Sequence, residues 1–405
     1  MPRPRQWIAL LHYTAPSILG GVEQVLGAHA AGLRALGAEV TIVAGRGRAA
    51  AGTRLARVPE LDSRHPAVLR DFAALARGEV TPGHATLADR IERRLRTVLA
   101  KADRVVVHNA FTLHKNPALT VALARLARER PGAFVAWTHD LAWRDEQYAA
   151  QRHPGEPWDL FARALPGVRY VAVSEERARQ LAELTGLARE RICVVPNGID
   201  IAGALGLSAQ GARLAESLDL YRADPLLVLP ARLTRRKRVE AAIAATKALR
   251  ERGRDATLVV TGPPGPHNVG NRRYLEELTA LARDAPGVHL LHALGIRAPY
   301  RLVADLYALA DALVLPSANE GFGIPLLEAA LHRLPIVCSD LATLRAVGGD
   351  AATYVPVDAS GEVIADAVVG VLDTPAARLR SGARALAWPR VIAERVAPVV
   401  LAGRP

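Results

Sequence analysis

Two glutamates, Glu320 and Glu328, stand eight positions apart where an apolar run enters the glycine-rich stretch EGFGIPLLEAAL. The pattern predicts a strand, a tight turn and a helix, with one carboxylate at the mouth of the helix and the other about two turns along it, on a similar face. One carboxylate can then meet a sugar and the other a ribose. The backbone N–H groups between them, together with the helix dipole, form a seat for phosphate oxygens. These N–H groups belong to Gly321, Phe322, Gly323 and Ile324.

Two exposed glutamates at helical spacing can also be ordinary surface charge. Here the glycines on either side of Phe322 indicate a backbone turn that comes close to another group, and Pro325 suits the first turn of a helix. Paired carboxylates also occur in glycosidases, but two residues on one helix can hardly flank a scissile bond. The pair therefore predicts ligand binding rather than hydrolysis of a polysaccharide.

A second candidate is the basic loop PARLTRRKRVE, which follows the apolar run LLVLP. Arg232 and Lys237 bracket this loop, and a guanidinium with an ammonium can stabilise a departing diphosphate without a metal. The alternative is a solvated basic turn, which is the interpretation we give to Arg235, Arg236 and Arg238. Gly262, in the turn after the next predicted strand, can edge the same phosphate pocket or belong to a plain loop.

Near the N-terminus, Gly20 and Gly21 stand between a predicted strand and an amphipathic helix. Paired glycines at such a turn let a ligand approach the backbone and leave helix N-terminal amides free for an anion. A tight turn without a ligand is an equal alternative, because this is not a complete G-x-G-x-x-G pattern.

Polar residues also follow two other strands of the first half. His139 and Asp140 end the run AFVAWTHD, and His108 and Asn109 end the run RVVVHN. His139 can hydrogen-bond a sugar hydroxyl or an acceptor, whereas a single histidine is more often structural. His108, Asn109 and Asp140 are candidates for an acceptor pocket.

Apolar runs of four to eight residues alternate with helical periodicity along the chain, which predicts βαβ units and parallel sheets covered on both faces. We expect a first Rossmann-like domain over residues 1–200, a break from about Ile201 to Asp224, and a second such domain over residues 201–384. The tail, residues 385–405, is expected to form a helix interrupted by Pro389 that crosses back to the first domain. In doubly wound sheets ligands lie outside the carboxyl ends of the strands, so two facing domains would enclose a cleft.

Composition narrows the class of protein. The 405 residues carry a net charge of +12 and only two cysteines, which excludes a cysteine metal cluster. The charge can reflect an arginine-rich proteome or attraction to anionic lipid, and scarce aromatic residues disfavour nucleic acid. No signal region or membrane span is recognised, so we expect a cytoplasmic protein and leave open peripheral association with the inner membrane surface.

Taken together, the segments GGVEQVLGAHAAGL, VVPNGID, PARLTRRKRVEAAIAA and NEGFGIPLLEAALHRLPIVCSD resemble the retaining glycosyltransferases of family four. The resemblance implies the GT-B architecture, in which a first, acceptor-binding domain and a second, donor-binding domain face each other. It implies that Glu320 contacts the donor sugar, Glu328 the ribose, and Arg232 with Lys237 the diphosphate. Gly21 would approach the phosphates, and His139 would lie beside the reacting sugar.

The predicted activity is therefore metal-independent transfer of a hexose from a nucleotide sugar to a hydroxyl acceptor, with retention and without a cofactor. The donor is expected to be a UDP or GDP sugar, with an ADP sugar as a further option. The acceptor can be a small molecule, a saccharide, a sugar acid or a lipid-linked glycan. The alternatives are a sugar-nucleotide epimerase, a phosphorylase and a catalytically silent nucleotide-sugar binding protein. The sequence departs from the family at Arg238, where a glycine often follows the lysine, and it does not indicate the oligomeric state.

Overall fold

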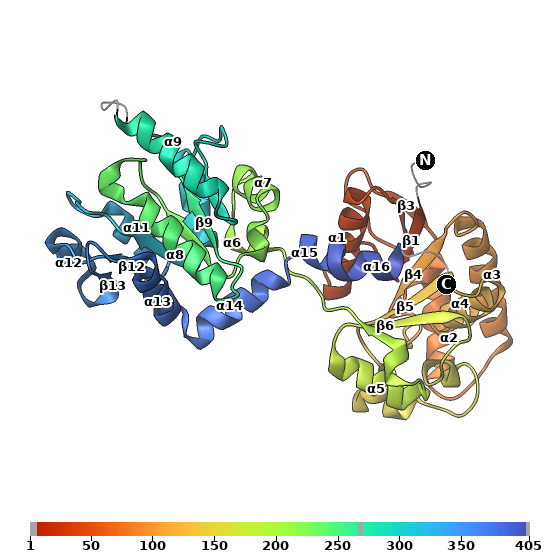
Figure 1. Ribbon diagram of the computed structural model, residues 1–405. Coiled ribbons are helices and arrows are strands. Elements are labelled where there is room, and N and C mark those ends of the chain that lie inside the picture. Colours follow the sequence, from red (N-terminus) through yellow and green to blue (C-terminus); the bar gives the residue numbers. More distant parts are fainter. Residues whose placement is uncertain (1–5, 266–269, 402–405) are drawn as a thin grey trace. The chain divides into compact units, whose positions relative to one another are not determined.

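The computed structural model describes residues 6–265 and 270–401 (Figure 1). Contacts divide the chain into two compact units, one formed by Met1–Gly198 with Trp388–Pro405 and the other by Ile199–Ala387. Each unit is built on one parallel sheet with helices in the connections, which confirms the predicted α/β class with two Rossmann-like sheets. The units are described separately below.

The first unit contains a seven-stranded sheet in the order β3-β2-β1-β4-β5-β6-β7. Its strands are β1 Trp7–Leu11, β2 Glu39–Ala44, β3 Arg54–Arg57, β4 Arg104–His108, β5 Phe134–Thr138, β6 Val168–Ala172 and β7 Ile192–Val194. Its helices are α1 Gly21–Ala35, α2 Pro66–Leu75, α3 Pro82–Val98, α4 Pro117–Glu129, α5 Glu175–Thr185, α15 Trp388–Val391 and α16 Ala397–Val400, with a π-helical turn η9 Ile392–Val396. Successive strand residues point to opposite faces, so Leu11 joins the core beneath α3 and α4, while Leu10 joins the core shared with α1 and the tail.

The second unit contains a six-stranded sheet in the order β10-β9-β8-β11-β12-β13. Its strands are β8 Leu226–Leu229, β9 Thr257–Val260, β10 Val288–Leu290, β11 Ala312–Leu315, β12 Ile336–Ser339 and β13 Thr353–Val355. Its helices are α6 Ile201–Leu205, α7 Ala209–Ser217, α8 Val239–Glu251, α9 Gly270–Arg283, α10 Tyr300–Leu309, α11 Ile324–Leu331, α12 Ala342–Gly348, α13 Gly361–Leu372 and α14 Pro375–Ala385. In both sheets the strand order reverses at one point, between β1 and β4 and between β8 and β11, which is where doubly wound sheets bind ligands.

The alternation of strands and helices is interrupted from about Ile201 to Asp224 as expected, since β7 ends at Val194 and β8 begins at Leu226, and this stretch holds the helices α6 and α7. Both helices carry side-chain caps: Asp200 accepts a hydrogen bond from Gly203 N at 2.9 Å, and Ser208 accepts one from Gly211 N at 3.1 Å. Such caps satisfy N–H groups that have no partner inside the helix. The helices are short, so their apolar periodicity was too brief to be recognised.

Residues 45–85 are polar, basic and without clear periodicity, which predicts loops and short helices, but they also contain strand β3. Arg54 and Arg57 at its ends are exposed, and it pairs only with β2 at the edge of the sheet. Charged residues are common on edge strands because they discourage pairing with other chains, and they also hide the alternation that identifies a strand.

The C-terminal segment α15–η9–α16 belongs to the first unit and packs beside α1 (Figure 1). Pro389 lies in the first turn of α15, where its missing N–H is tolerated, so it does not interrupt a helix as expected. Within residues 6–265 and 270–401 no helix combines the length and apolar character needed to cross a membrane.

Candidate functional site

The loops that follow β8 and β11 carry the basic residues and the first glutamate. These strands are parallel neighbours at the switch point of the second sheet, so their carboxyl ends lie side by side. The two loops are joined directly, because Ala318 N donates to the carbonyl of Arg236 at 2.7 Å. The sheet therefore brings together residues that are more than eighty positions apart in the sequence.

Lys237 and Glu320 form an ion pair at this edge of the sheet, and each residue is only 8% exposed. Ser317 Oγ donates to the same carboxylate oxygen, Glu320 Oε1, at 2.7 Å. The other oxygen, Oε2, lies 3.9 Å from Nη1 of Arg236. A buried carboxylate is tolerated only when it is paired and hydrogen-bonded, and Lys237 with Ser317 meets that requirement. Arg236, interpreted from the sequence as solvated charge only, also borders the cluster.

Arg232 is exposed and lies at the start of the same loop. Its guanidinium has neither a hydrogen bond nor an ion pair within the described part of the chain, so it is available to an external anion. Gly262 packs against the backbone beside it: a Cβ added at Gly262 would lie 2.0 Å from Ala231 O and 2.6 Å from Arg232 Cα. Only glycine lets the two loops approach this closely.

The Gly321–Ile324 turn leads into α11, which begins at Ile324. Gly323 adopts φ 106°, and an added Cβ would lie 2.7 Å from Leu344 Cδ2, so glycine is required there on two counts. Phe322 is 57% exposed and Ile324 60% exposed. The turn therefore presents both its backbone and apolar side chains to the surroundings.

The placement of the two glutamates differs from the prediction. Glu320 lies in the loop before α11 and is buried, whereas Glu328 is the fifth residue of α11 and is half-buried, so the two do not share one helix face. Glu328 Oε2 accepts a hydrogen bond from the hydroxyl of Tyr307 at 2.9 Å. Tyr307 belongs to α10. It could not be identified from the sequence, because a tyrosine in an apolar helix is usually a residue of the hydrophobic core.

A cavity of about 350 Å³ lies beside the Gly321–Ile324 turn and is lined by residues of both α11 and α12. Its lining consists of Gly321, Phe322, Leu327, Thr343, Ala346 and Val347. Its side-chain lining is mostly apolar and contains no ionisable group, so the side chains of this cavity are suited to contact an apolar group.

The structure shows how Arg238 takes the position at which a glycine often follows the lysine. It adopts φ 46°, in the left-handed region that favours glycine, at the position before α8. Its guanidinium donates to the carbonyls of Val357 and Ala359, so the side chain ties this turn to the loop after β13. Arg238 is thus structural and not the solvated charge that we expected.

In the first unit, the Gly20–Gly21 turn is occupied by a side chain that the sequence analysis missed. Glu23, in the first turn of α1, accepts a hydrogen bond from Thr14 Oγ1 and lies 3.7 Å from His12 Nε2. Burial raises the pKa of Glu23, but the contacts with His12 and Thr14 outweigh it and lower the pKa to about 2. A Cβ at Gly20 would lie 2.1 Å from Glu23 Oε2, whereas one at Gly21 would meet open space.

The three predicted acceptor-pocket residues, His108, Asn109 and Asp140, and His139, predicted to lie beside the reacting sugar, come together at the carboxyl ends of β4 and β5. Asn109 Oδ1 accepts from the backbone N–H groups of His139 and Asp140 at 2.8 and 3.1 Å, and its Nδ2 donates to Asp140 Oδ2 at 2.9 Å. His108 Nδ1 lies 3.1 Å from His139 Nε2. Asn109 adopts φ 61°, a conformation that asparagine tolerates better than most residues. One amide side chain therefore connects the two strand ends.

His29 extends this cluster inward, against the rings of Trp137 and His108. Burial lowers the pKa of His29 to about 3 and that of His139 to about 4, and it also lowers the pKa of His108. At neutral pH these imidazoles are uncharged, so His139 offers a hydrogen bond and not a positive charge. His29 was not identified from the sequence, and the feature that could have indicated it is a histidine among the buried apolar residues of α1.

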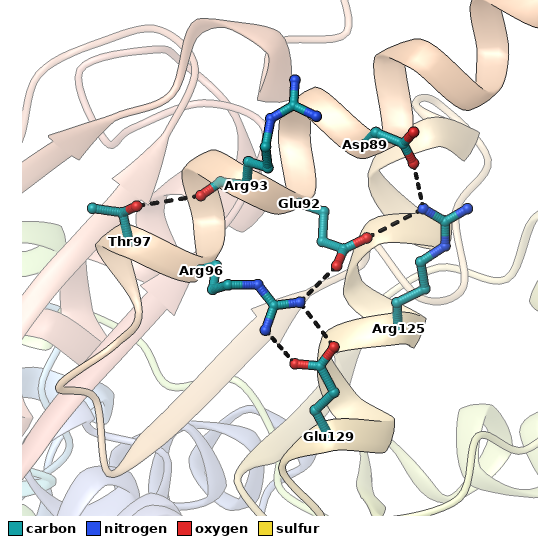
Figure 2. Close-up of polar contacts among 7 residues, drawn as sticks. All are labelled: Asp89, Glu92, Arg93, Arg96, Thr97, Arg125 and Glu129. Carbon is teal, nitrogen blue, oxygen red and sulfur yellow. Dashed lines mark hydrogen bonds and ion pairs between the residues drawn. The ribbon is translucent and has the colours of Figure 1, made fainter.

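Much of the positive charge of the first unit is neutralised locally. Between α3 and α4, Arg96 contacts Glu92 and Glu129, and Arg125 contacts Asp89 and Glu92 (Figure 2). Exposed pairs of this kind contribute little to stability, about 0 to 1 kcal/mol each. They do reduce the charge that this surface offers to a polyanion.

Two family models match the chain. The model of Glycosyltransferase Family 4 matches residues 19–202, and that of Glycosyl transferases group 1 matches residues 224–374. The second segment contains the Lys237–Glu320 cluster, and the first contains the Asn109–Asp140 cluster.

Named relatives agree with this assignment. The D-inositol 3-phosphate glycosyltransferase of Nocardia farcinica is 32% identical over 187 residues, which cover 46% of this chain and 40% of that protein. The mannosylglucosylglycerate synthase of Thermotoga maritima is 29% identical over 262 residues, covering 60% of this chain and 58% of that protein. The chain spans about half the length of the curated relatives it matches.

Among solved structures, sucrose-phosphate synthase from Thermosynechococcus elongatus aligns over 96% of this chain and 97% of its own, with 18% identity and a TM-score of 0.40.

The two matched segments, 19–202 and 224–374, leave only the junction and the chain ends unmatched. The chain belongs to the glycosyltransferases of group 1 and family 4.

Proposed function

We propose that this protein transfers a hexosyl group from a nucleoside-diphosphate sugar to a hydroxyl acceptor, with retention of configuration at the anomeric carbon. The observation that carries this proposal is the cluster of Lys237, Glu320 and Ser317 at the switch point of the second sheet, in the same loop region as Arg232, which is exposed and has no ion pair among the described residues. It holds a cation pair and an oriented carboxylate next to a glycine-rich turn, which suits a diphosphate joined to a sugar.

In the proposed reaction, the donor diphosphate binds Arg232, Lys237 and the amides of the Gly321–Ile324 turn, and Glu320 holds hydroxyls of the sugar. The bond between the anomeric carbon and the phosphate oxygen breaks, and the two cations stabilise the charge that develops on the diphosphate. The acceptor hydroxyl attacks from the same face and gives its proton to an oxygen of the departing phosphate. The new glycosidic bond then has the configuration of the old one.

The two cations supply the charge stabilisation that a divalent metal provides in other phosphate-transfer sites, so we propose that the reaction needs no metal and no cofactor. A UDP or GDP sugar is the proposed donor, with an ADP sugar next. Activity that persists in excess EDTA would support this part of the proposal, and activity restored only by Mg²⁺ or Mn²⁺ would contradict it.

We propose that the first unit binds the acceptor through Asn109, Asp140 and His139. An amide, a carboxylate and a neutral imidazole are groups that hydrogen-bond hydroxyls, and this matches the polyol and sugar-acid chemistry in the names of the two relatives described above. A panel of polyol phosphates, sugar acids, saccharides and lipid-linked glycans, assayed for loss of donor and gain of a glycosylated product, would identify the class.

The decisive experiment compares the wild-type protein with the double variant Arg232→Ala, Lys237→Ala. Loss of one donor to a developing charge typically costs about 10²- to 10³-fold in kcat, so we expect the double variant to lose at least about 10³-fold. Arg235→Ala is the matched control, because Arg235 is in the same loop but pairs with Glu277 and stacks on Tyr274. Near-normal transfer by the double variant would refute the assignment. Conversion of a nucleotide sugar without an acceptor would instead indicate an epimerase, and binding without turnover a silent binding protein.

A further inference from the structure

Glu320, in the loop before α11, and Glu328, within α11, each accept a hydrogen bond from the neutral hydroxyl of a buried side chain, and Glu328 also has the exposed Tyr300 as a partner. Ser317 Oγ donates to Glu320 Oε1 at 2.7 Å, and Tyr307 Oη donates to Glu328 Oε2 at 2.9 Å. We propose that Ser317 and Tyr307 are positioning residues with separate tasks: Ser317 fixes the carboxylate that receives the sugar, and Tyr307 fixes the carboxylate that receives the nucleoside ribose. This inference rests on the proposed function.

Ser317 is fully buried and lies two residues after the end of β11, so the sheet holds its backbone. Glu320 Oε1 also contacts Lys237, which we assign to the diphosphate. When the ammonium of Lys237 turns to the phosphate oxygens, its hold on Glu320 weakens, and Ser317 remains as the fixed donor to Oε1. The second oxygen, Oε2, then keeps the orientation in which it can accept from a sugar hydroxyl. A fixed hydrogen bond preserves geometry that would otherwise have to be ordered again in the transition state.

Tyr307 is 2% exposed, and its ring stacks on His332 at the end of α11, with centroids 5.7 Å apart and planes 11° apart. Its hydroxyl also lies 3.4 Å from Pro325 O, in the first turn of α11. The ring is therefore held at one end of α11 and the hydroxyl at the other, with Glu328 between them. Burial, reinforced by the Glu328 carboxylate, raises the pKa of Tyr307, so the phenol keeps its proton and acts as a donor at neutral pH.

The two tasks predict opposite kinetic effects. Removing Ser317 Oγ frees Glu320, which acts on the reacting sugar, so Ser317→Ala should lower kcat by about tenfold and leave the Kd of the free nucleoside diphosphate within twofold. Removing Tyr307 Oη leaves Glu328 with only the exposed hydroxyl of Tyr300 as a phenol partner. Glu328 acts on the part of the donor that does not react, so Tyr307→Phe should raise that Kd and the donor KM by about tenfold with kcat within twofold. A hydrogen bond to a charged group is of this order in strength.

Two control variants separate positioning from folding. Ser339 is also fully buried at the end of a strand of the same sheet, but its Oγ lacks a hydrogen-bond partner among the described residues, so Ser339→Ala deletes the same atom without freeing a carboxylate. Tyr170 in the first unit is buried, and its hydroxyl accepts from Leu165 N at 2.9 Å, so Tyr170→Phe deletes an engaged phenol elsewhere. Melting temperatures are measured for all four variants.

The experiment measures Kd for UDP and GDP by calorimetry, and donor KM and kcat with the acceptor found in the panel. The crossed pattern, with kcat changed in one variant and nucleotide Kd in the other while the controls match wild type, would establish the two tasks. If the wild-type protein binds and transfers but both variants shift the same parameter, or neither parameter, this inference is wrong and the proposed function stands. If the wild-type protein binds no nucleoside diphosphate, the proposed function itself fails.

Discussion

The carboxylate of Glu320 in the second unit contacts several side chains at once. Glu320 contacts the ammonium of Lys237, accepts from Ser317 and lies near Arg236. Taking a carboxylate out of water costs several kcal/mol unless charge and hydrogen bonds compensate, and here both come from loops that belong to neighbouring strands. A ligand diphosphate would compete with Glu320 for Lys237, so binding exchanges one ionic contact for another and avoids exposing a bare charge.

The buried histidines of the first unit make its stability depend on pH. The pKa is about 3 for folded His29 and about 4 for folded His139, against 6.5 for a free histidine. Below pH 6.5 the unfolded chain therefore binds more protons than the folded one, and the free energy of unfolding falls as pH decreases toward 4. Each such histidine contributes a slope of about 1.4 kcal/mol per pH unit, and this loss is absent above pH 6.5.

We expect His29→Phe to reduce that slope by about 1.4 kcal/mol per pH unit between pH 6 and 4.5. Phenylalanine preserves the ring contacts with Trp137 and Trp388, and it also removes a buried Nδ1 that lacks a partner within the described residues. All five tryptophans lie in the first unit, so urea unfolding followed by tryptophan fluorescence reports on this unit alone. His332→Phe in the second unit is the control. An unchanged slope in His29→Phe would show that His29 is not among the groups that titrate on unfolding.

The connection from β8 to α8 shows how one element tolerates an unfavourable backbone. Arg238 adopts φ 46° and compensates through its bonds to the carbonyls of Val357 and Ala359. Arg238→Ala loses these bonds and keeps the strained backbone, whereas Arg238→Gly loses the bonds and relieves the strain. We expect the glycine variant to be the more stable of the two by about 1 kcal/mol.

The free energy of unfolding of each variant is measured by urea unfolding, followed by far-ultraviolet circular dichroism, and the difference between the two values is the quantity predicted. Gly321→Ala is a useful reference, since a Cβ there would meet open space and Gly321 does not have a positive φ. Equal stability of the alanine and glycine variants would mean that the left-handed conformation is not retained once the guanidinium is gone.

Strands buried on both faces could be located from the sequence alone. The strands Arg104–His108 and Ile336–Ser339 lie within the apolar runs RVVVHN and PIVCSD, because a run of buried apolar residues between polar ends leaves little choice of register. Elements that carry few apolar residues were missed. Strand β3, with arginines at both ends, and the short helix α7 are stabilised by pairing and capping, which leave little periodic signal.

The candidate site could be predicted as residue types but not as contacts. The sequence indicated that Glu320 and Lys237 belong near phosphate and sugar, yet it did not show that they pair with each other, because that contact depends on the neighbouring positions of β8 and β11. Glu23 and Tyr307 were missed for a related reason. Each contacts residues on another segment of the chain, Glu23 with Thr14 and Tyr307 with Glu328, and a single polar residue in a helix carries no pattern that reveals such contacts.

At the scale of the whole chain, the C-terminal segment completes the core of the first unit. Four of its side chains, Val391, Ile392, Val396 and Val400, belong to the buried cluster beneath α1. The contact is close, because a Cβ added at Gly32 of α1 would lie 2.6 Å from Ile392 Cγ1. Arg169 of β6 also donates to Val399 O at 2.9 Å. The core of the first unit is thus completed by the segment 388–401, and the unit should not reach full stability without that segment.

This arrangement predicts a specific non-additive effect. Ile392→Ala should lower the free energy of unfolding of the first unit by about 2 to 5 kcal/mol by leaving a cavity, and Gly32→Ala should lower it by about 1 to 3 kcal/mol by overpacking. In the double variant the new methyl group occupies space vacated by Ile392, so its cost should be smaller than the sum of the two. Tryptophan fluorescence in urea measures all three, with Leu379→Ala on the exposed face of α14 as the control. Strict additivity would mean that α1 and the tail do not pack at this point.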